Sequence, residues 1–69
     1  MDPLTPARIK ALRQRLGLSL RQIAPLVGVH YSTWSRWEAG EREPEGSSAI
    51  LLRMLERGAI GPRAPETDP

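Results

Sequence analysis

The chain lacks cysteine and phenylalanine altogether, and it has a single histidine, His30. Without cysteine it can form neither a disulfide framework nor a thiolate zinc site, and one imidazole cannot supply a pair of histidine ligands. We therefore expect no metal and no cofactor, and packing alone must stabilise the fold. A chain of 69 residues forms one domain at most, with little room for a large active-site cleft.

Long apolar runs are also missing. The longest run, Ala49 to Leu52, is far shorter than the roughly 20 residues that cross a bilayer. The N-terminal stretch MDPLTPAR contains no apolar core of a signal peptide. We therefore expect a soluble, cytoplasmic protein without a membrane partner.

No group of residues indicates catalysis. His30 has no identifiable carboxylate or nucleophile to work with, so a turn position or a phosphate contact is its favoured interpretation. Three glutamates lie in the Pro-containing segment that follows Gly40, where a run of charges is usually solvated: Glu41, Glu43 and Glu45. We expect no enzyme.

Positive charge is concentrated in the first half of the chain. Residues 1–27 carry five basic side chains against one acidic side chain, whereas residues 28–45 carry two basic and four acidic ones. This uneven distribution, with a pI near 9.9, is compatible with a phosphate-backbone partner. It is equally compatible with a basic surface that is only solvated.

Capping residues predict the first two helices. Thr5 can cap a helix that starts at Pro6 and ends at Gly17, with Arg8, Lys10 and Arg15 displayed to solvent. Ser19 and Gln22 form an S-x-x-Q capping box at the start of a second helix, which Gly28 ends. Pro25 lies inside this second helix and predicts a bend or a local irregularity.

Two further helices follow after short connections. One is expected over residues 31–39 with Gly40 at its end, and another starts from the cap Ser47 and ends at Gly58. No strand-like alternation is present, so the fold class is all-α, a compact bundle of about four short helices. Residues 1–58 form the domain, and residues 59–69 form a flexible Pro-rich tail.

All aromatic side chains lie within seven positions of the third helix. Trp34 and Trp37 are three residues apart and share a face, which favours core packing over stacking on nucleic-acid bases. Tyr31 lies at the helix start on another face, where we expect it to be exposed.

The run LGLSLRQIAPLVGVHYSTWSRWEAGEREP resembles the helix-turn-helix of Cro and the phage repressors, the XRE family, over about residues 8–56. The matching positions are Leu16, Gly17, Leu18, Ala24, Gly28, Trp34, Trp37, Glu38, Gly40 and Pro44. The resemblance implies a lambda-repressor-like bundle that binds double-stranded DNA, with the helix over residues 31–39 in the major groove. It also implies a transcriptional repressor that binds a palindromic operator as a homodimer.

The resemblance assigns candidate roles to single residues. The candidates to read bases are Tyr31, Ser32, Thr33 and Arg36. The candidates to contact phosphates are Arg21, His30, Ser35 and Arg42. The family's arginine ahead of the LG pair and its glutamate ahead of the terminal glycine match Arg13 and Glu38, which implies an internal ion pair.

The chain departs from the family pattern at three positions. Leu20 replaces a glutamine that helps to hold a phosphate, and Arg21 beside it can substitute. His30 replaces the usual Ser or Thr cap, so the recognition helix has a weaker cap or begins at Ser32, and Pro25 is unusual at its position.

The fourth helix adds two expectations. Its apolar arc spans about 200°, more than the roughly 100° that a core-facing helix needs. Spare surface at Leu52, extended by Ile60, predicts a dimer contact, and a wholly buried helix is the competing interpretation. The segment SSAILLRMLERG is also similar to the DNA-binding domains of HigA-type and MqsA-type antitoxins. An alternative function is therefore a module that binds protein, such as a toxin or a polymerase subunit.

Overall fold

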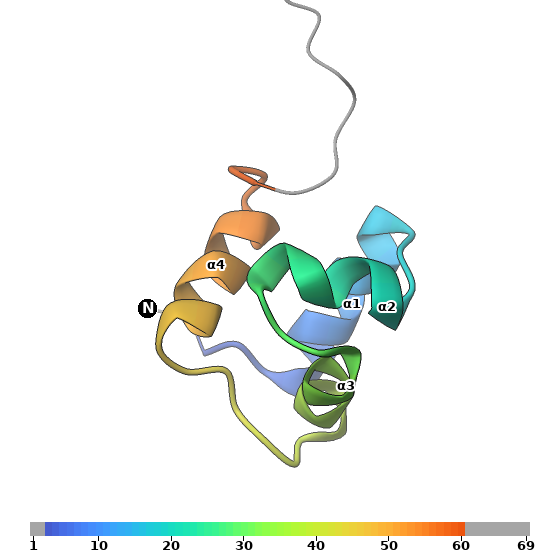
Figure 1. The fold of residues 1–69 in the computed structure, drawn as a ribbon, viewed down its shortest axis with the longest axis vertical. Helices are drawn as coiled ribbons and strands as arrows, with labels where there is room; N and C mark the ends of the chain where they lie inside the picture. The colour runs from blue at the N-terminus through green and yellow to red at the C-terminus, as the bar shows by residue number, and fades with distance from the viewer. Residues whose placement is uncertain (1–2, 61–69) are drawn as a thin grey trace, which may run out of the picture.

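The computed structural model describes residues 3–60, and these residues are all-α. The elements follow in the order α1 (Pro6–Leu16), α2 (Leu20–Ile23), the 3-10 helix η1 (Ala24–Val27), α3 (Tyr31–Ala39) and α4 (Ser47–Glu56). Figure 1 shows α2 and α4 on opposite sides of the molecule, with η1 between them and α3 below. The predicted fold class, a helical bundle that contains a helix-turn-helix, is confirmed.

Local sequence sets both ends of α1. The Thr5 hydroxyl accepts a hydrogen bond from the backbone N–H of Arg8 at 3.2 Å, and Pro6 occupies the first turn, where its missing N–H costs nothing. Gly17 ends the helix in the left-handed conformation, with φ 70°, which a side chain would strain. The predicted boundaries of this helix are confirmed.

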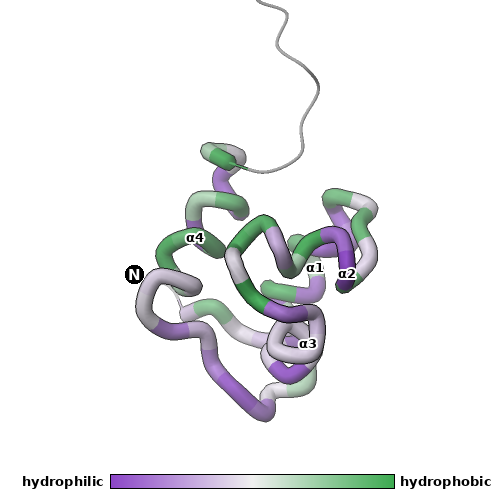
Figure 2. The backbone as a smooth tube through the Cα atoms, in the orientation of Figure 1, coloured by the Kyte–Doolittle hydropathy of each residue, from purple (hydrophilic) through white to green (hydrophobic). Residues whose placement is uncertain are grey.

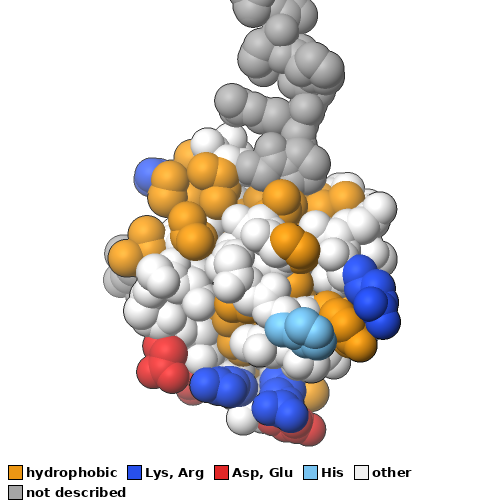
Figure 3. All heavy atoms as spheres, in the orientation of Figure 1, with side chains coloured by type: hydrophobic (Ala, Val, Ile, Leu, Met, Phe, Trp, Pro, Cys, Tyr) orange, Lys and Arg blue, Asp and Glu red, His pale blue; other side chains and the backbone are white. Residues whose placement is uncertain are grey.

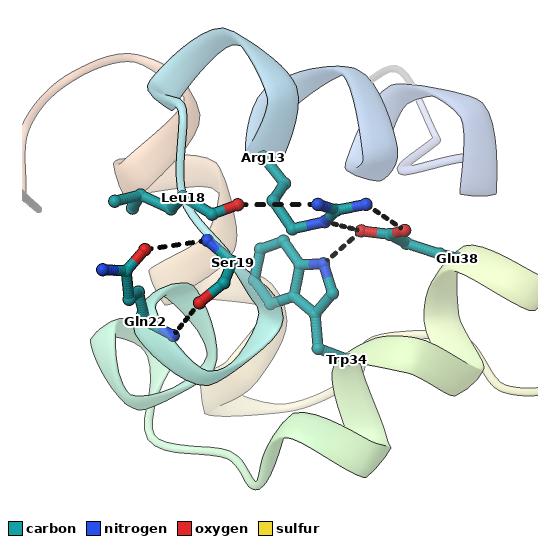
Figure 4. A network of polar contacts seen from close by, with 6 residues as sticks. All are labelled: Arg13, Leu18, Ser19, Gln22, Trp34 and Glu38. Atoms are coloured by element: carbon teal, nitrogen blue, oxygen red, sulfur yellow. Dashed lines mark hydrogen bonds and ion pairs between the residues drawn. The ribbon is translucent and has the colours of Figure 1, made fainter.

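The second helix changes type at its proline. Ser19 and Gln22 form the predicted capping box, with hydrogen bonds of 3.2 and 2.9 Å (Figure 4). Pro25 has no N–H to donate to the Arg21 carbonyl, and the chain leaves the α-helix at Ala24 for a 3-10 helix. The irregularity predicted at Pro25 is therefore a switch of helix type.

Both tryptophans lie in the core. Trp34 is 0% exposed and Trp37 is 2% exposed, and their ring centroids are 5.4 Å apart. A ring without solvent access cannot stack on a base, so the interpretation as core side chains is confirmed. The other buried core residues are Ile9, Leu12, Ile23, Ala24, Val27, Leu52 and Leu55. Figure 2 shows hydrophobic stretches in η1 and α4, and a hydrophilic loop between α3 and α4.

The fourth helix differs from the prediction in two respects. Gly46 with φ 61°, rather than Ser47, occupies the N-cap position, and no side chain caps this end. Leu52, expected at a spare apolar surface, is 0% exposed, whereas Ile50 is 62% exposed. The prediction was wrong because a helical wheel gives the width of an apolar arc. Which part of the arc faces the core depends on η1, against which α4 packs.

The start of the predicted tail is partly described. The backbone N–H of Ala59 donates to the Met54 carbonyl at 2.8 Å, and Ile60 is half-buried against the core. Residues 61–69, the rest of the predicted tail, lie outside the described residues. The domain boundary after residue 58 stays a prediction.

Candidate nucleic-acid interface

The burial of Trp34 and Trp37 decides which side of α3 reaches solvent. Residues three or four positions apart share a helix face, so the polar positions just before and between the tryptophans lie toward the outer side. The exposed side chains there are Ser32, Ser35 and Arg36. Thr33 is half-buried. The helix therefore shows a short polar surface that is held in place by two large core side chains.

The Arg36 guanidinium has no partner in the part of the chain that the structure describes. No ion pair or hydrogen bond joins its side chain to another residue within 3–60, and the nearby Glu41 bonds only through its backbone N–H, to the Arg36 carbonyl at 2.9 Å. All of its side-chain donors are therefore free to bind a ligand.

His30 caps α3. Its Nδ1 atom lies 3.2 Å from the backbone nitrogen of Ser32 and 2.8 Å from the Ser32 hydroxyl. Because a backbone N–H can only donate, Nδ1 is the unprotonated nitrogen, and the neutral ring carries its proton on Nε2. The helix begins at Tyr31. Of the two alternatives left open by the sequence, the structure has the weaker cap and not the later start.

Tyr31 is half-buried rather than exposed, which corrects the prediction. The guanidinium carbon of Arg21 lies 4.2 Å from the centre of the Tyr31 ring, and Arg21 Nη2 donates to the phenol oxygen at 3.2 Å. The imidazole of His30 lies 4.4 Å from the same ring, tilted by 31°. Arg21 of α2 and His30, the residue before α3, therefore both contact the Tyr31 side chain.

A hollow of about 330 Å³ lies beside α3. Its lining residues come from the turn before α3, from α3 itself and from the loop that follows: Gly28, Val29, His30, Thr33, Trp37, Arg42, Glu43, Glu45 and Ser48. Three predicted site residues therefore meet there, His30, Thr33 and Arg42. Figure 3 shows the histidine on this face with Lys or Arg side chains on both sides of it and acidic side chains near the lower edge.

A partly buried polar network links α3 to α1 (Figure 4). Arg13 Nε and Nη2 donate to the Glu38 carboxylate at 2.6 and 3.0 Å, so the ion pair predicted between these residues is present. The indole Nε1 of Trp34 donates to the same carboxylate at 2.7 Å. Burial alone would raise the pKa of Glu38, but these hydrogen bonds and the charge of Arg13 outweigh it and lower the pKa below its ordinary value.

A second ion pair was missed by sequence reasoning. Arg8 donates to both carboxylate oxygens of Glu56, at 2.6 and 2.8 Å, and Arg15 donates to the Glu56 carbonyl at 2.8 Å. The expectation that Arg8 faces solvent is therefore corrected, since Arg8 is half-buried, whereas Lys10 and Arg15 are exposed as predicted. The hydrogen bonds from Arg8 lower the pKa of Glu56 and outweigh burial, which would raise it. The partners are 48 positions apart in the chain, so no local pattern predicts this pair.

Within residues 3–60 no group of three or more His, Cys, Asp or Glu side chains is arranged to hold a metal ion. In the same part of the chain, no helix has the length and apolar character that crossing a membrane requires.

The arrangement of two short helices across a tight turn, packed between two others, defines a helix-turn-helix protein. The model of the helix-turn-helix domain family matches residues 7–63, most of the chain. Among solved structures, the chain is similar to the DNA-binding domain of the P22 C2 repressor, determined by nuclear magnetic resonance. The identity is 29%, the TM-score is 0.70, and the match covers 83% of this chain and 76% of that one. No curated protein matches the chain.

This chain belongs to the helix-turn-helix family of the XRE and Cro type. The family and the fold together identify a DNA-binding regulator.

Proposed function

We propose that this chain is a sequence-specific regulator of transcription that binds double-stranded DNA with α3 in the major groove. The observation that carries the proposal is that α3 has two different faces. Its tryptophans are buried on one face, whereas Ser32, Ser35 and Arg36 are exposed. The major groove of B-DNA admits one α-helix, and its base edges present a different pattern of donors and acceptors for each base pair. A polar helix face of this kind suits that groove.

Base reading is assigned to Tyr31, Ser32, Thr33 and Arg36. Arg36 is the strongest of the four, because its guanidinium, which has no partner within residues 3–60, can donate to guanine O6 and N7 together. The two hydroxyls of Ser32 and Thr33 can donate or accept, and therefore add contacts that tolerate several bases.

Phosphate contacts are assigned to Arg21, His30, Ser35 and Arg42, all of which are exposed. Positive charge near the groove attracts the DNA backbone whatever its sequence. His30 fits this role in its neutral form, since Nδ1 caps the helix and the Nε2 proton is left to donate.

The finer part of the proposal is a repressor that acts as a homodimer on a palindromic operator. The similar P22 protein is a repressor, as its name states. The exposed Ile50 offers an apolar position for a two-fold contact on α4. The regulator has no catalytic step, and it works in the cytoplasm.

A second candidate function is a module that binds a protein, such as a toxin or a polymerase subunit. The exposure of Ile50 favours this function too, because a large hydrophobic side chain that is 62% exposed suits any apolar partner. The two functions differ in their response to salt. DNA binding weakens steeply as counterions are released, whereas apolar protein binding does not.

The test is selection of duplex DNA from a random pool with the purified chain, followed by a salt titration on the recovered sequence. We expect one motif to be enriched and the logarithm of its affinity to fall linearly with the logarithm of salt concentration. Recovery of no motif, together with an affinity for random DNA that salt does not change, would refute the proposed function.

A further inference from the structure

Arg21 and Tyr31 are ten positions apart, on different helices of the helix-turn-helix, yet their side chains form one unit. The Arg21 guanidinium lies over the Tyr31 ring at 4.2 Å and also donates to its hydroxyl at 3.2 Å. A phosphate contact by Arg21 alone would act equally on every DNA sequence. The link to Tyr31 gives Arg21 a second route to influence binding.

The hydrogen bond from Arg21 decides whether the Tyr31 hydroxyl donates or accepts in a further hydrogen bond. Its oxygen already accepts a hydrogen bond from a cation, which makes it a poorer acceptor for a second donor and favours donation of its single proton to another partner. Donation from a cationic group also polarises the phenol and strengthens the hydroxyl as a donor. In the major groove, acceptors are presented by guanine, adenine N7 and thymine O4, whereas cytosine presents only its amino donor.

We propose that Arg21 is a specificity-determining positioning residue, which holds Tyr31 as a hydrogen-bond donor toward a guanine, adenine or thymine edge and against cytosine. This inference rests on the proposed function, because it needs α3 in the major groove. Arg21 acts on the base through Tyr31, and it remains exposed for a phosphate contact of its own.

Two features of the site support a fixed position for Tyr31. The ring is half-buried against the core, and the imidazole of His30 lies 4.4 Å from it. His30 is itself held by its cap on Ser32. A flat guanidinium can stack on the ring and reach its hydroxyl at once, which a lysine ammonium cannot do in the same way.

The test is the variant Arg21→Lys, which keeps the positive charge but loses the flat guanidinium. Affinity is measured for the selected sequence and for random duplex DNA. The selected sequence is also replaced one base pair at a time. Arg57→Lys is the matched control, because Arg57 is exposed just beyond α4 and far along the chain from the proposed site. The NMR signals of the ring of Tyr31, the single tyrosine, report its position without DNA.

We expect Arg21→Lys to lower the ratio of selected to random affinity roughly fivefold or more, because a weakened phosphate contact lowers both affinities by the same factor and leaves that ratio unchanged. The preference against cytosine should weaken at one base pair, and the Tyr31 ring signals should shift. Tyr31→Phe should lose the same preference, and the double variant should lose no more than either single variant. Arg57→Lys should change none of these values.

The outcomes separate the two proposals. A wild-type chain that selects no sequence sinks the proposed function and this inference with it. A selective wild-type chain whose base preferences survive Arg21→Lys overturns this inference alone, and Arg21 is then only a phosphate contact. Additive losses for Arg21→Lys and Tyr31→Phe would also overturn it.

Discussion

Arg13 and Glu38 join α1 to the last turn of α3 through two hydrogen bonds between a guanidinium and a carboxylate. Both side chains are largely withdrawn from solvent, at 21% and 13% exposed. The Glu38 carboxylate also holds the indole of Trp34, the residue that orients α3. One partly buried carboxylate therefore supports the position of the helix to which we assign base reading.

Glu38→Gln should lower the free energy of unfolding by about 1–3 kcal/mol, because it leaves the Arg13 guanidinium without its charged partner. In a domain of this size, thermal melting should shift down by about 4–8 °C for each kcal/mol. Glu41→Gln, at an exposed loop position, is the control. Equal melting temperatures for the two variants would show that the pair does not stabilise the fold.

The stability of the chain should fall in acid. The pKa values of Glu38 and Glu56 are both lowered from an ordinary value of 4.5. Their contribution is therefore fully present above that pH and is lost as the pH falls through the folded-state values. Melting temperatures measured between pH 7 and pH 2 should show this loss, and the double variant of Glu38→Gln and Glu56→Gln should show a flatter curve. A double variant with the wild-type acid dependence would contradict the assignment.

Replacing the histidine cap should affect α3 first. His30→Ala removes the acceptor of the Ser32 N–H and should cost about 1 kcal/mol, the usual value of an N-cap. His30→Ser restores a capping oxygen and should recover most of this loss in thermal melting. If alanine and serine give the same melting temperature, the cap contributes nothing to stability.

Arg36→Ala should weaken binding to the selected DNA by about 1–3 kcal/mol and relax the preference at one base pair. Arg57→Ala removes the same charge from an exposed position outside the proposed interface and serves as the control. Affinities for selected and random duplexes decide the role. If Arg36→Ala lowers the affinities for selected and random duplexes by the same factor, Arg36 is a phosphate contact. Base reading is then assigned to Tyr31, Ser32 and Thr33.

Ile50 should carry the dimer contact that we assign to α4. Ile50→Glu places a charge on an exposed position, so stability should change by no more than about 0.5 kcal/mol. Sedimentation should show a dimer for the wild-type chain on DNA at high concentration and a monomer for the variant. Dimers of equal strength in both would place the contact elsewhere.

Some features of the site were predictable because they depend on residues that lie close together in the sequence. The end of α3 at Ala39 follows from the neighbouring Gly40, and burial of Trp34 and Trp37 follows from their spacing on one face. The Arg13 and Glu38 pair was predictable from the family resemblance alone, since 25 positions separate the two residues. Neither a local sequence pattern nor the family resemblance predicted the stacking of Arg21 on Tyr31.

The sequence by itself determined both ends of α1, the start of α2 and the irregularity at Pro25, because capping side chains, glycines and prolines act within a few bonds of the backbone that they control. Only the tertiary structure decided which apolar side chain of α4 is buried, since Leu52 and Ile50 are equally hydrophobic and differ in the direction that packing against η1 gives them. The tertiary structure also decided the pairing of Arg8 with Glu56, because the two residues are 48 positions apart in the chain. Contacts between helices depend on how those helices are placed in space, and that placement is a property of the whole core.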